Sequence, residues 1–400
     1  MRAAGFESRA GALLAGLCLV TRAFAAFATE PPLREIAGPQ AVVYAVDASD
    51  HVVVSQGADL QFLPASTLKL FTTLLAIDQL GLDYRFRTEL YLRDDELIVR
   101  GFGDPFLVSE ELDRLAAEAA SRLGHRPLAG IAVDDSFFSP DVRIPGVGRS
   151  SNPYDALNAA VAVNFNTIAV RRVGDRYVSA EPQTPMTPLA ASLARARRVR
   201  GSERIQLGDN PSEVTRYAGE LIAAKLRAAG VRIGERVSRA RAPQGPPLLV
   251  HRSSRTLADV CRDMLAISNN FVANQVFLTI GAEAYGAPAS LAKARRAAHR
   301  YLDAHPLLTG LHVVEGSGIA YENEATATAM TALLKLFEPY RSLLKADHGT
   351  QHKTGTLQAI ATVAGYLDTD RHGTVRYVVA VPGDRPDRRW QVVAWLRRNL

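Results

Sequence analysis

Residues 62–77 carry the sequence FLPASTLKLFTTLLAI, and the organisation of the whole chain follows from this stretch. Pro64 suits the first turn of a helix, the apolar residues after Lys69 suit a buried helix, and Gly81 suits its end. Ser66 and Lys69 are three residues apart, so they are expected to meet on one helical face. A serine at this end of a helix also lies near the positive end of the helix dipole, which favours a developing alkoxide. The stretch predicts a nucleophilic serine with a lysine beside it as base.

The composition is that of an ordinary globular protein. The 400 residues are 47% hydrophobic and 22% charged, which allows a sizeable core and suggests two or three domains. The net charge is only +6, and no block of Lys and Arg is long enough for a nucleic-acid patch. We therefore expect no nucleic-acid partner, although a weakly basic surface is compatible with an anionic polymer.

The basic residues are chosen very unevenly. Only six of the 47 are lysines, namely Lys69, Lys225, Lys293, Lys335, Lys345 and Lys353. In such a chain a lysine needs a chemical reason more than an arginine does, because only lysine can lose its proton and act as a base. This argument favours a special role for Lys69 and, less strongly, for Lys353.

The N-terminus has the pattern of an export signal. Arg2 and Arg9 precede an apolar run over residues 10–20, and small residues follow in AFA at 23–25 and 26–28. We predict a signal peptide at 1–28 and export to the periplasm or the extracytoplasmic cell envelope. The run is too short for a comfortable transmembrane helix and no later stretch is long enough, so at most peripheral membrane association is expected. Removal of the signal leaves Cys261 as the single cysteine, which excludes an internal disulfide.

Both ends of the remaining chain favour strands, and helices lie between them. Residues 41–46 and 52–54 predict a hairpin, and residues 356–367 and 374–381 predict a second one before a final helix at 387–400. Further helices are expected at 257–267, 271–280 and 290–302. This order predicts an α/β fold with an antiparallel sheet, assembled from both ends of the chain and flanked by helices.

The region at 85–245 has a different character and is expected to be an inserted accessory domain. Strands are predicted at 86–92, 97–100 and 131–133, helices at 110–123 and 212–229, and a proline-rich segment at 242–247 closes the region. The insertion is thus a mixed or mainly β unit. It would divide a catalytic domain made of residues 29–84 and 246–400.

Three short motifs stand in order: Ser66-Thr67-Leu68-Lys69, Ser268-Asn269-Asn270 and Lys353-Thr354-Gly355-Thr356. Singly, each has a simpler structural explanation, such as a helix cap for Ser66 or a turn at Ser268. Together they match the signature of penicillin-binding proteins and class A β-lactamases. Lys69 can take the proton of Ser66 if burial and nearby cations depress its pKa.

The second and third motifs are suited to proton relay and substrate binding. Ser268 and Asn270 lie between two predicted helices, where a short loop can aim a hydroxyl and an amide into a cleft. Lys353 is expected to begin an apolar strand along whose edge a peptide can pair. Thr354 and Thr356 would then reach the terminal carboxylate of the peptide, and Gly355 would leave room for its close approach.

From about residue 41 to the C-terminus, the sequence resembles the D-alanyl-D-alanine carboxypeptidase/endopeptidase family of low-molecular-mass class C penicillin-binding proteins. The matching segments, in order, are 64–70, 101–105, 134–136, 163–166, 268–270, 316–318, Asn323 with Thr326, and 352–356. The resemblance implies a penicillin-recognising transpeptidase-like core with an inserted domain. It also implies hydrolysis of peptidoglycan stem peptides and covalent inhibition by β-lactam antibiotics, with no metal or organic cofactor.

The resemblance further implies a role for each matching position. Ser66 would form an acyl-enzyme with D-Ala-D-Ala, Lys69 would be the base, and Ser268 would help return the proton to the leaving group. Lys353, Thr354 and Thr356 would bind the carboxylate, and the backbone N–H groups of Ser66 and Thr356 would form the oxyanion hole. Two segments depart from the family pattern: Ala273-Asn274 stands in place of Ala-Glu, and EGSGIAY at 315–321 stands in place of DGSGLSR.

Two alternatives remain open from the sequence. A β-lactamase would share the acylation chemistry, although no glutamate lies in an obvious deacylation motif and the insertion is long for that class. A non-catalytic cell-wall-binding protein on the same fold would account for the two departures. The sequence does not distinguish carboxypeptidase from endopeptidase action, the third stem-peptide residue or the oligomeric state.

Overall fold

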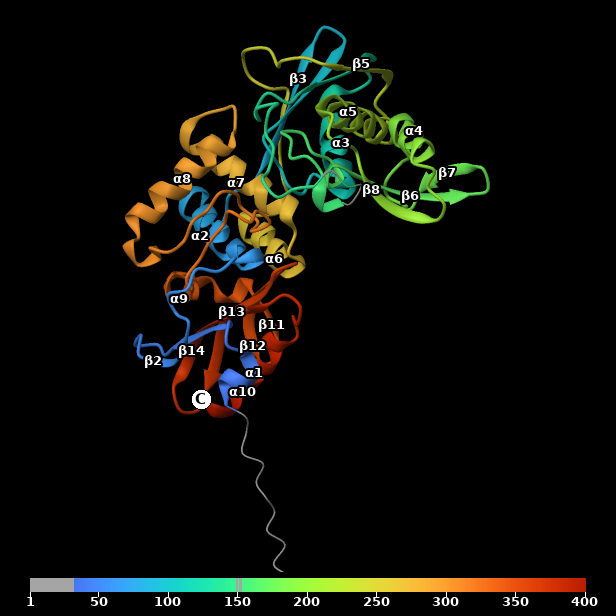
Figure 1. Ribbon diagram of the computed structural model, residues 1–400. Coiled ribbons are helices and arrows are strands. Elements are labelled where there is room, and N and C mark those ends of the chain that lie inside the picture. Colours follow the sequence, from blue (N-terminus) through green and yellow to red (C-terminus); the bar gives the residue numbers. More distant parts are fainter. Residues whose placement is uncertain (1–31, 149, 151–152) are drawn as a thin grey trace, which may run out of the picture. The chain divides into compact units, whose positions relative to one another are not determined.

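A computed structural model describes residues 32–148, 150 and 153–400 (Figure 1). The predicted signal peptide at 1–28 lies outside these residues. Across the described part of the chain, none of the helices combines the length and the apolar character needed to cross a membrane.

A six-stranded antiparallel sheet is built from both ends of the described chain, as predicted. Its order is β11-β12-β13-β14-β1-β2, so that β1, early in the sequence, pairs with β14 near the C-terminus (Figure 1). Both predicted hairpins are present, as β1 with β2 and as β13 with β14. The strands are β1 (Val42–Val46), β2 (Val52–Gln56), β11 (Lys345–Asp347), β12 (Thr350–Leu357), β13 (Ile360–Thr369) and β14 (Gly373–Pro382).

Each face of this sheet packs against its own hydrophobic cluster. Side chains alternate along a strand, so Val378 joins the cluster on one face and Val379 the cluster on the other. The terminal helices α1 (Leu33–Ala37) and α10 (Arg388–Asn399) cover the face of Val379. The other face packs against α9 (Ala327–Phe337), a helix that the sequence analysis missed.

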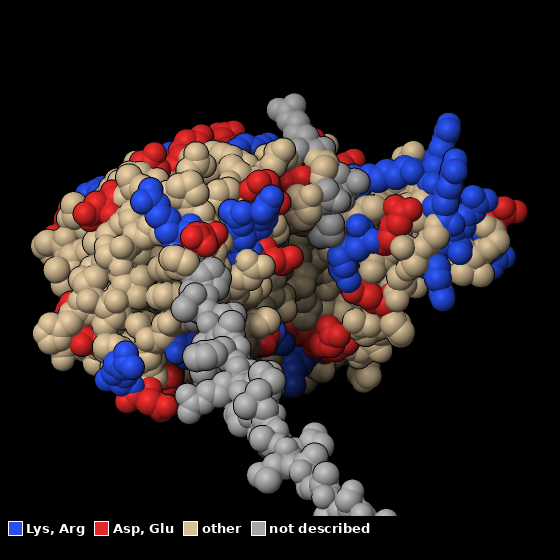
Figure 2. Space-filling view, turned by 60° about the horizontal axis from the view of Figure 1, so that its bottom comes forward, with Lys and Arg blue, Asp and Glu red and all other residues tan. Residues whose placement is uncertain are grey.

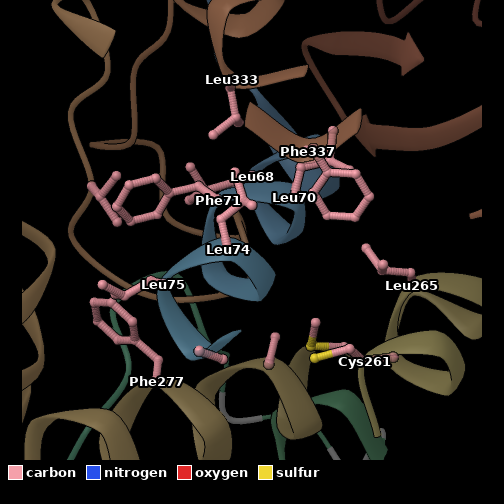
Figure 3. Close-up of a cluster of buried hydrophobic side chains, with 14 of the residues drawn as sticks. Leu68, Leu70, Phe71, Leu74, Leu75, Cys261, Leu265, Phe277, Leu333 and Phe337 are labelled. Carbon is pink, nitrogen blue, oxygen red and sulfur yellow. The ribbon is translucent and has the colours of Figure 1, made fainter. Parts of the chain in front are cut away.

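The helical layer is centred on α2 (Lys69–Leu80), which is buried from Lys69 to Ala76. Its apolar side chains meet Cys261 and Leu265 from α6, Phe277 from α7, and Leu333 and Phe337 from α9 (Figure 3). The cysteine is fully buried, and burial raises the pKa of its thiol to about 12, so the thiol stays protonated. The predicted helices here are confirmed as α6 (Leu257–Ile267), α7 (Asn270–Tyr285) and α8 (Leu291–Ala304).

The region predicted as an insertion contains two further sheets. A mixed sheet has the order β10-β3-β4-β5-β9, and a small antiparallel sheet has the order β7-β6-β8. The helices α3 and α5 pack against the larger sheet around one hydrophobic cluster. The elements are β3 (Arg87–Arg93), β4 (Glu96–Gly101), α3 (Ser109–Leu123), β5 (Leu128–Asp134), β6 (Thr167–Val173), β7 (Arg176–Ser179), α4 (Pro188–Ala196), β8 (Ser202–Gln206), α5 (Pro211–Ala228), β9 (Ile233–Arg239) and β10 (Leu249–Arg252).

The sequence located β3, β4, β5, α3 and α5 in this region but missed β6 to β9 and α4. Strand β10 follows the predicted boundary at residue 245 and pairs with β3. Acidic and basic side chains are intermixed over much of the face in Figure 2, and basic ones gather over the small sheet, which carries Arg171, Arg172, Arg176 and Arg204.

The predicted continuous strand at 356–367 is wrong. Leu357 ends β12, Ile360 begins β13, and the two residues pair across a tight turn at Gln358-Ala359. Neither turn residue is the glycine, asparagine or proline that usually marks a hairpin in a sequence. Lys353 consequently lies in the middle of β12 and does not begin a strand.

Candidate active site

Ser66 lies on a tight turn that leads into α2. Ala65–Leu68 form a 3₁₀ turn, and the α-helix begins only at Lys69, which corrects the prediction that both residues share one α-helix. They still meet, because a 3₁₀ turn has three residues and places side chains i and i+3 above each other. The turn is tightly constrained, since the buried residue Ala65 has a positive φ of 47°. Gly81 ends the helix as predicted.

Lys69 is completely buried, and its amine has three oxygen neighbours. The Nζ atom lies 2.8 Å from Ser66 Oγ, 2.7 Å from Asn270 Oδ1 and 2.8 Å from the carbonyl oxygen of Ser317. None of these acceptors is a carboxylate. Burial holds the pKa of Lys69 well below its usual value, and the nearby charge of Lys353 lowers it further, against a smaller opposing effect of Glu315.

The three contacts specify how a neutral Lys69 is oriented. A neutral amine has two N–H donors and one lone pair. The Asn270 and Ser317 oxygens can only accept, so they take the two N–H groups, and the lone pair faces the Ser66 hydroxyl. Lys69 is therefore arranged to accept the proton of Ser66, which is the requirement for activating a serine nucleophile.

Ser268 and Asn270 form the corner between α6 and α7, as predicted from their position between two helices. Ser268 ends α6 in the left-handed conformation, with φ of 56°, and Asn269 caps α7 by accepting from the backbone N–H of Val272. The corner directs Asn270 to Lys69 and Ser268 to Lys353. No contact joins Ser268 to Ser66 directly within the described residues, so Ser268 reaches the site through Lys353.

Lys353 is a second buried lysine with no acidic partner at contact distance in the described chain. Its Nζ donates to Ser268 Oγ at 2.9 Å and to the carbonyl oxygen of Thr354 at 2.7 Å. Burial lowers the pKa of Lys353 to about 8, and the positive charge of Arg389 acts in the same direction. Around neutral pH this amine is still mostly protonated.

The third motif lies along a strand edge that is open beside the serine. Strand β11 pairs with β12 only as far as His352, so the edge from Lys353 to Leu357 has no strand partner on that side. Gly355 packs against the serine turn, and a Cβ atom at this position would lie 2.7 Å from the backbone nitrogen of Ser66. The Thr362 hydroxyl donates to the carbonyl of Pro64 at 2.9 Å and ties β13 to the same turn.

The two threonines of this motif differ in their surroundings. Thr354 is partly buried, and its carbonyl oxygen is occupied by Lys353. Thr356 is exposed, and its hydroxyl accepts a hydrogen bond of 2.8 Å from Arg389 Nη1. The same nitrogen donates to the carbonyl of Gly355 at 2.8 Å. Sequence reasoning missed Arg389, because it lies on the C-terminal helix in no recognisable motif.

The loop that supplies the Ser317 carbonyl is organised by the buried carboxylate of Glu315. Its two oxygens accept from the backbone N–H groups of Ser317, Gly318, Ile319 and Ala320 and from the side chains of Asn274, Ser317 and Asn323. Asn274 also accepts from the backbone N–H of Gly316 at 2.8 Å. The two departures from the family pattern thus meet in one network, where an amide at 274 complements the carboxylate at 315.

A cavity of about 560 Å³ adjoins the corner at Ser268. Its walls come from the small sheet and from the start of α7, and they combine aromatic, apolar and cationic groups. The lining residues are Tyr154, Phe165, Thr167, Arg204, Ile267, Ser268, Asn269, Asn270 and Phe271. In the described residues, no cluster of His, Cys, Asp and Glu has the arrangement of a metal site.

A family comparison identifies the class of enzyme to which this arrangement corresponds. Residues 21–338 match the family model of the D-Ala-D-Ala carboxypeptidase 3 (S13) family. The chain belongs to this family. The family predicted from the sequence is therefore confirmed, and with it, at the level of the family, the expected class of serine-type carboxypeptidase.

Individual relatives have low sequence identity to this chain, but their alignments cover most of its length. A D-alanyl-D-alanine carboxypeptidase from Actinomadura sp. is 26% identical over 347 residues, and the alignment covers 73% of this chain and 63% of the relative's length. The carboxypeptidase DacB from Haemophilus influenzae is 24% identical over 404 residues, which cover 84% of this chain and 83% of DacB.

The solved structure of penicillin-binding protein 4 (dacB) from Haemophilus influenzae superimposes with a TM-score of 0.73 at 19% identity, over 91% of this chain and 98% of that one. A second structure of that protein, in complex with a β-lactam, has a TM-score of 0.69. The predicted fold class, a penicillin-binding type of α/β core, is confirmed.

Proposed function

We propose that this S13-family protein is a serine-type D-Ala-D-Ala carboxypeptidase or DD-endopeptidase that cleaves peptidoglycan stem peptides through an acyl-enzyme on Ser66. One observation carries the proposal: a fully buried lysine, free of any carboxylate contact, lies 2.8 Å from the hydroxyl of the serine in the turn that leads into α2. This arrangement supplies a neutral base at the nucleophile without any further group.

In the proposed reaction, Ser66 Oγ attacks the carbonyl carbon of the penultimate D-Ala while Lys69 accepts its proton. The backbone N–H groups of Ser66 and Thr356 stabilise the oxyanion, a contribution of about 3 kcal/mol for each donor. The proton then returns from Lys69 to the amine of the departing residue, and Ser268, which accepts from Lys353, helps to deliver it there. Water then hydrolyses the ester and returns Ser66 to its starting state.

The remaining predicted residues bind the substrate in this proposal. The stem peptide lies along the open edge of β12, with its terminal carboxylate near Lys353, Thr354 and Thr356, and Gly355 allows the close approach. Asn270 orients Lys69 through its Oδ1 atom and keeps its Nδ2 donors for the peptide. The cavity beside Ser268 accommodates the side chain of the third stem residue.

The proposal includes export and covalent inhibition by β-lactams. The signal-like pattern of residues 10–28 supports function in the periplasm or elsewhere in the extracytoplasmic cell envelope. A β-lactam presents a strained amide and a carboxylate to the same groups, so penicillin is expected to acylate Ser66.

Labelling with a fluorescent penicillin followed by peptide mapping tests the proposal, with Ser66→Ala as the matched control. We expect one adduct, on Ser66, and release of D-alanine from a pentapeptide. Mass spectrometry of cross-linked muropeptides then separates carboxypeptidase from endopeptidase action. A folded wild-type protein without an adduct and without D-alanine release would refute the proposal, whereas rapid turnover of nitrocefin would favour the β-lactamase alternative.

A further inference from the structure

Two cations lie next to the open edge of β12 without counter-ions. No ion pair in the described chain includes Lys353 or Arg389, and every acceptor that they contact is a neutral carbonyl or hydroxyl oxygen. Lys353 is buried and Arg389 is partly buried. Placing two like charges together away from water is unfavourable, and an anion bound between them would offset that cost.

The guanidinium of Arg389 is only partly used by the protein. Its Nη1 atom donates to the carbonyl of Gly355, to the hydroxyl of Thr356 and, at 3.5 Å, to the carbonyl of Thr362. Its Nε atom is buried without a hydrogen-bond partner, and its Nη2 atom makes no hydrogen bond to the described residues. The acidic residue that acts on it most is Asp387, which forms no ion pair with it and is exposed. Because Nε is enclosed by protein and Nη1 is occupied, Arg389 can offer a carboxylate its positive charge and its Nη2 donors.

The bond from Arg389 to Thr356 also orients the threonine. Because the Thr356 hydroxyl accepts from Nη1, its own proton points away from the guanidinium and is available to a ligand at the strand edge. One oxygen of a carboxylate bound at that edge can therefore accept a hydrogen bond from the Thr356 hydroxyl, while the other carboxylate oxygen faces the guanidinium. Lys353 contributes its charge from three residues earlier on the same strand.

We propose that Arg389 is a carboxylate-binding residue of the site, which selects peptides whose leaving residue carries a free α-carboxylate. This inference rests on the proposed function, because it concerns the leaving residue of the D-Ala-D-Ala bond. The chemical class that Arg389 recognises is a free carboxylate, as opposed to an amide or ester at the same position. Arg389 thus extends the binding site from the three sequence motifs to the C-terminal helix.

The test compares two forms of one peptide, a diacylated L-Lys-D-Ala-D-Ala with a free C-terminal carboxylate and the same peptide as its C-terminal amide. The variant Arg389→Met removes the charge, Arg389→Lys keeps it, and Arg388→Met is the matched control. Arg388 is the neighbouring residue on α10, and its guanidinium extends to Gly38 instead of β12. The measurement is kcat/KM for release of D-alanine or D-alaninamide.

For Arg389→Met we expect kcat/KM for the acid peptide to fall about tenfold to a hundredfold, which is the range for a charge-assisted hydrogen bond. We expect kcat/KM for the amide peptide to stay within about twofold of the wild-type value. Arg389→Lys should restore part of the preference, and Arg388→Met should keep it whole. Equal losses on both peptides would show that Arg389 only supports the strand, and would overturn the inference. Unchanged activity on the acid would overturn it as well.

A binding measurement separates this inference from the proposed function. Ser66→Ala protein, with and without Arg389→Met, is titrated with the acid and the amide peptide by calorimetry. We expect the acid to bind more tightly than the amide only when Arg389 is present. If the wild-type enzyme cleaves neither peptide, the proposed function fails by itself, and the titration still decides whether Arg389 recognises a carboxylate. Equal affinity for acid and amide in the presence of Arg389 would refute its role.

Discussion

Replacing Gly355 by alanine introduces a methyl group at the point where β12 packs on the serine turn. The new Cβ atom would lie 2.4 Å from Thr362 Oγ1, 2.7 Å from the backbone nitrogen of Ser66 and 2.8 Å from Ala65 Cβ. Ordinary contact requires about 3.5 Å, so the nitrogen of Ser66 must retreat by roughly 0.8 Å. Such overpacking costs about 1–3 kcal/mol of folding free energy.

The catalytic cost should exceed the cost in stability. The Ser66 nitrogen is one of the two proposed oxyanion donors, and the loss of one donor lowers turnover by about 10² to 10³, or about 3–4 kcal/mol. Stopped-flow labelling with a fluorescent penicillin measures the acylation rate, and urea unfolding measures stability. Gly201→Ala is the control, because that glycine has open space around its Cβ position. A folded Gly355→Ala protein that acylates within about threefold of wild type would refute this reasoning.

Three further predictions concern the charges of the site. Lys69→Arg should lower penicillin acylation by about 10² to 10⁴, because arginine keeps its proton; acylation at a rate close to wild type would contradict a role for Lys69 as base. The acylation rate of the wild type, measured against pH, should decline as pH rises through about 8. Lys353 attracts the substrate carboxylate only while it is protonated, and it loses its proton above its pKa. A rate that keeps rising beyond this pH would contradict that role. Glu315→Ala should destabilise the protein by at least about 3 kcal/mol in urea unfolding, because it leaves several buried N–H groups unpaired, and an unchanged midpoint would show that the loop holds without the carboxylate.

The sequence was sufficient for those parts of the site that depend on local spacing. Ser66 and Lys69 meet because they are three residues apart, and this spacing works in a 3₁₀ turn as well as in an α-helix. Ser268 and Asn270 lie at a corner because the apolar pattern of a helix stops before them and resumes after them. The uneven use of lysine and arginine singled out Lys69, and the structure buries that lysine completely, where a positive charge is costly.

Contacts between distant segments were not predictable from the sequence. Arg389 reaches Thr356 across 33 residues, and Asn274 meets Glu315 across 41, with no local pattern that would indicate either pair. The substitutions at 274 and 315 looked like independent departures, yet they are complementary partners in one hydrogen-bond network. The turn between β12 and β13 was missed for a local reason, since Gln358 and Ala359 are not typical turn residues.

The open edge of β12 also has a consequence for the solubility of the protein. An unpaired strand edge attracts the edges of other chains, which is a common origin of aggregation. Here the unpaired segment is only five residues long, from Lys353 to Leu357, and it begins beside the corner of α6 and α7, to which Lys353 is joined through Ser268. The positive charges of the buried Lys353 and of Arg389, which contacts this edge from α10, also repel a second copy of the same edge. A short anionic peptide fits an edge of this length and is attracted by its positive charge. The features that suit the edge to a stem peptide therefore also oppose self-association.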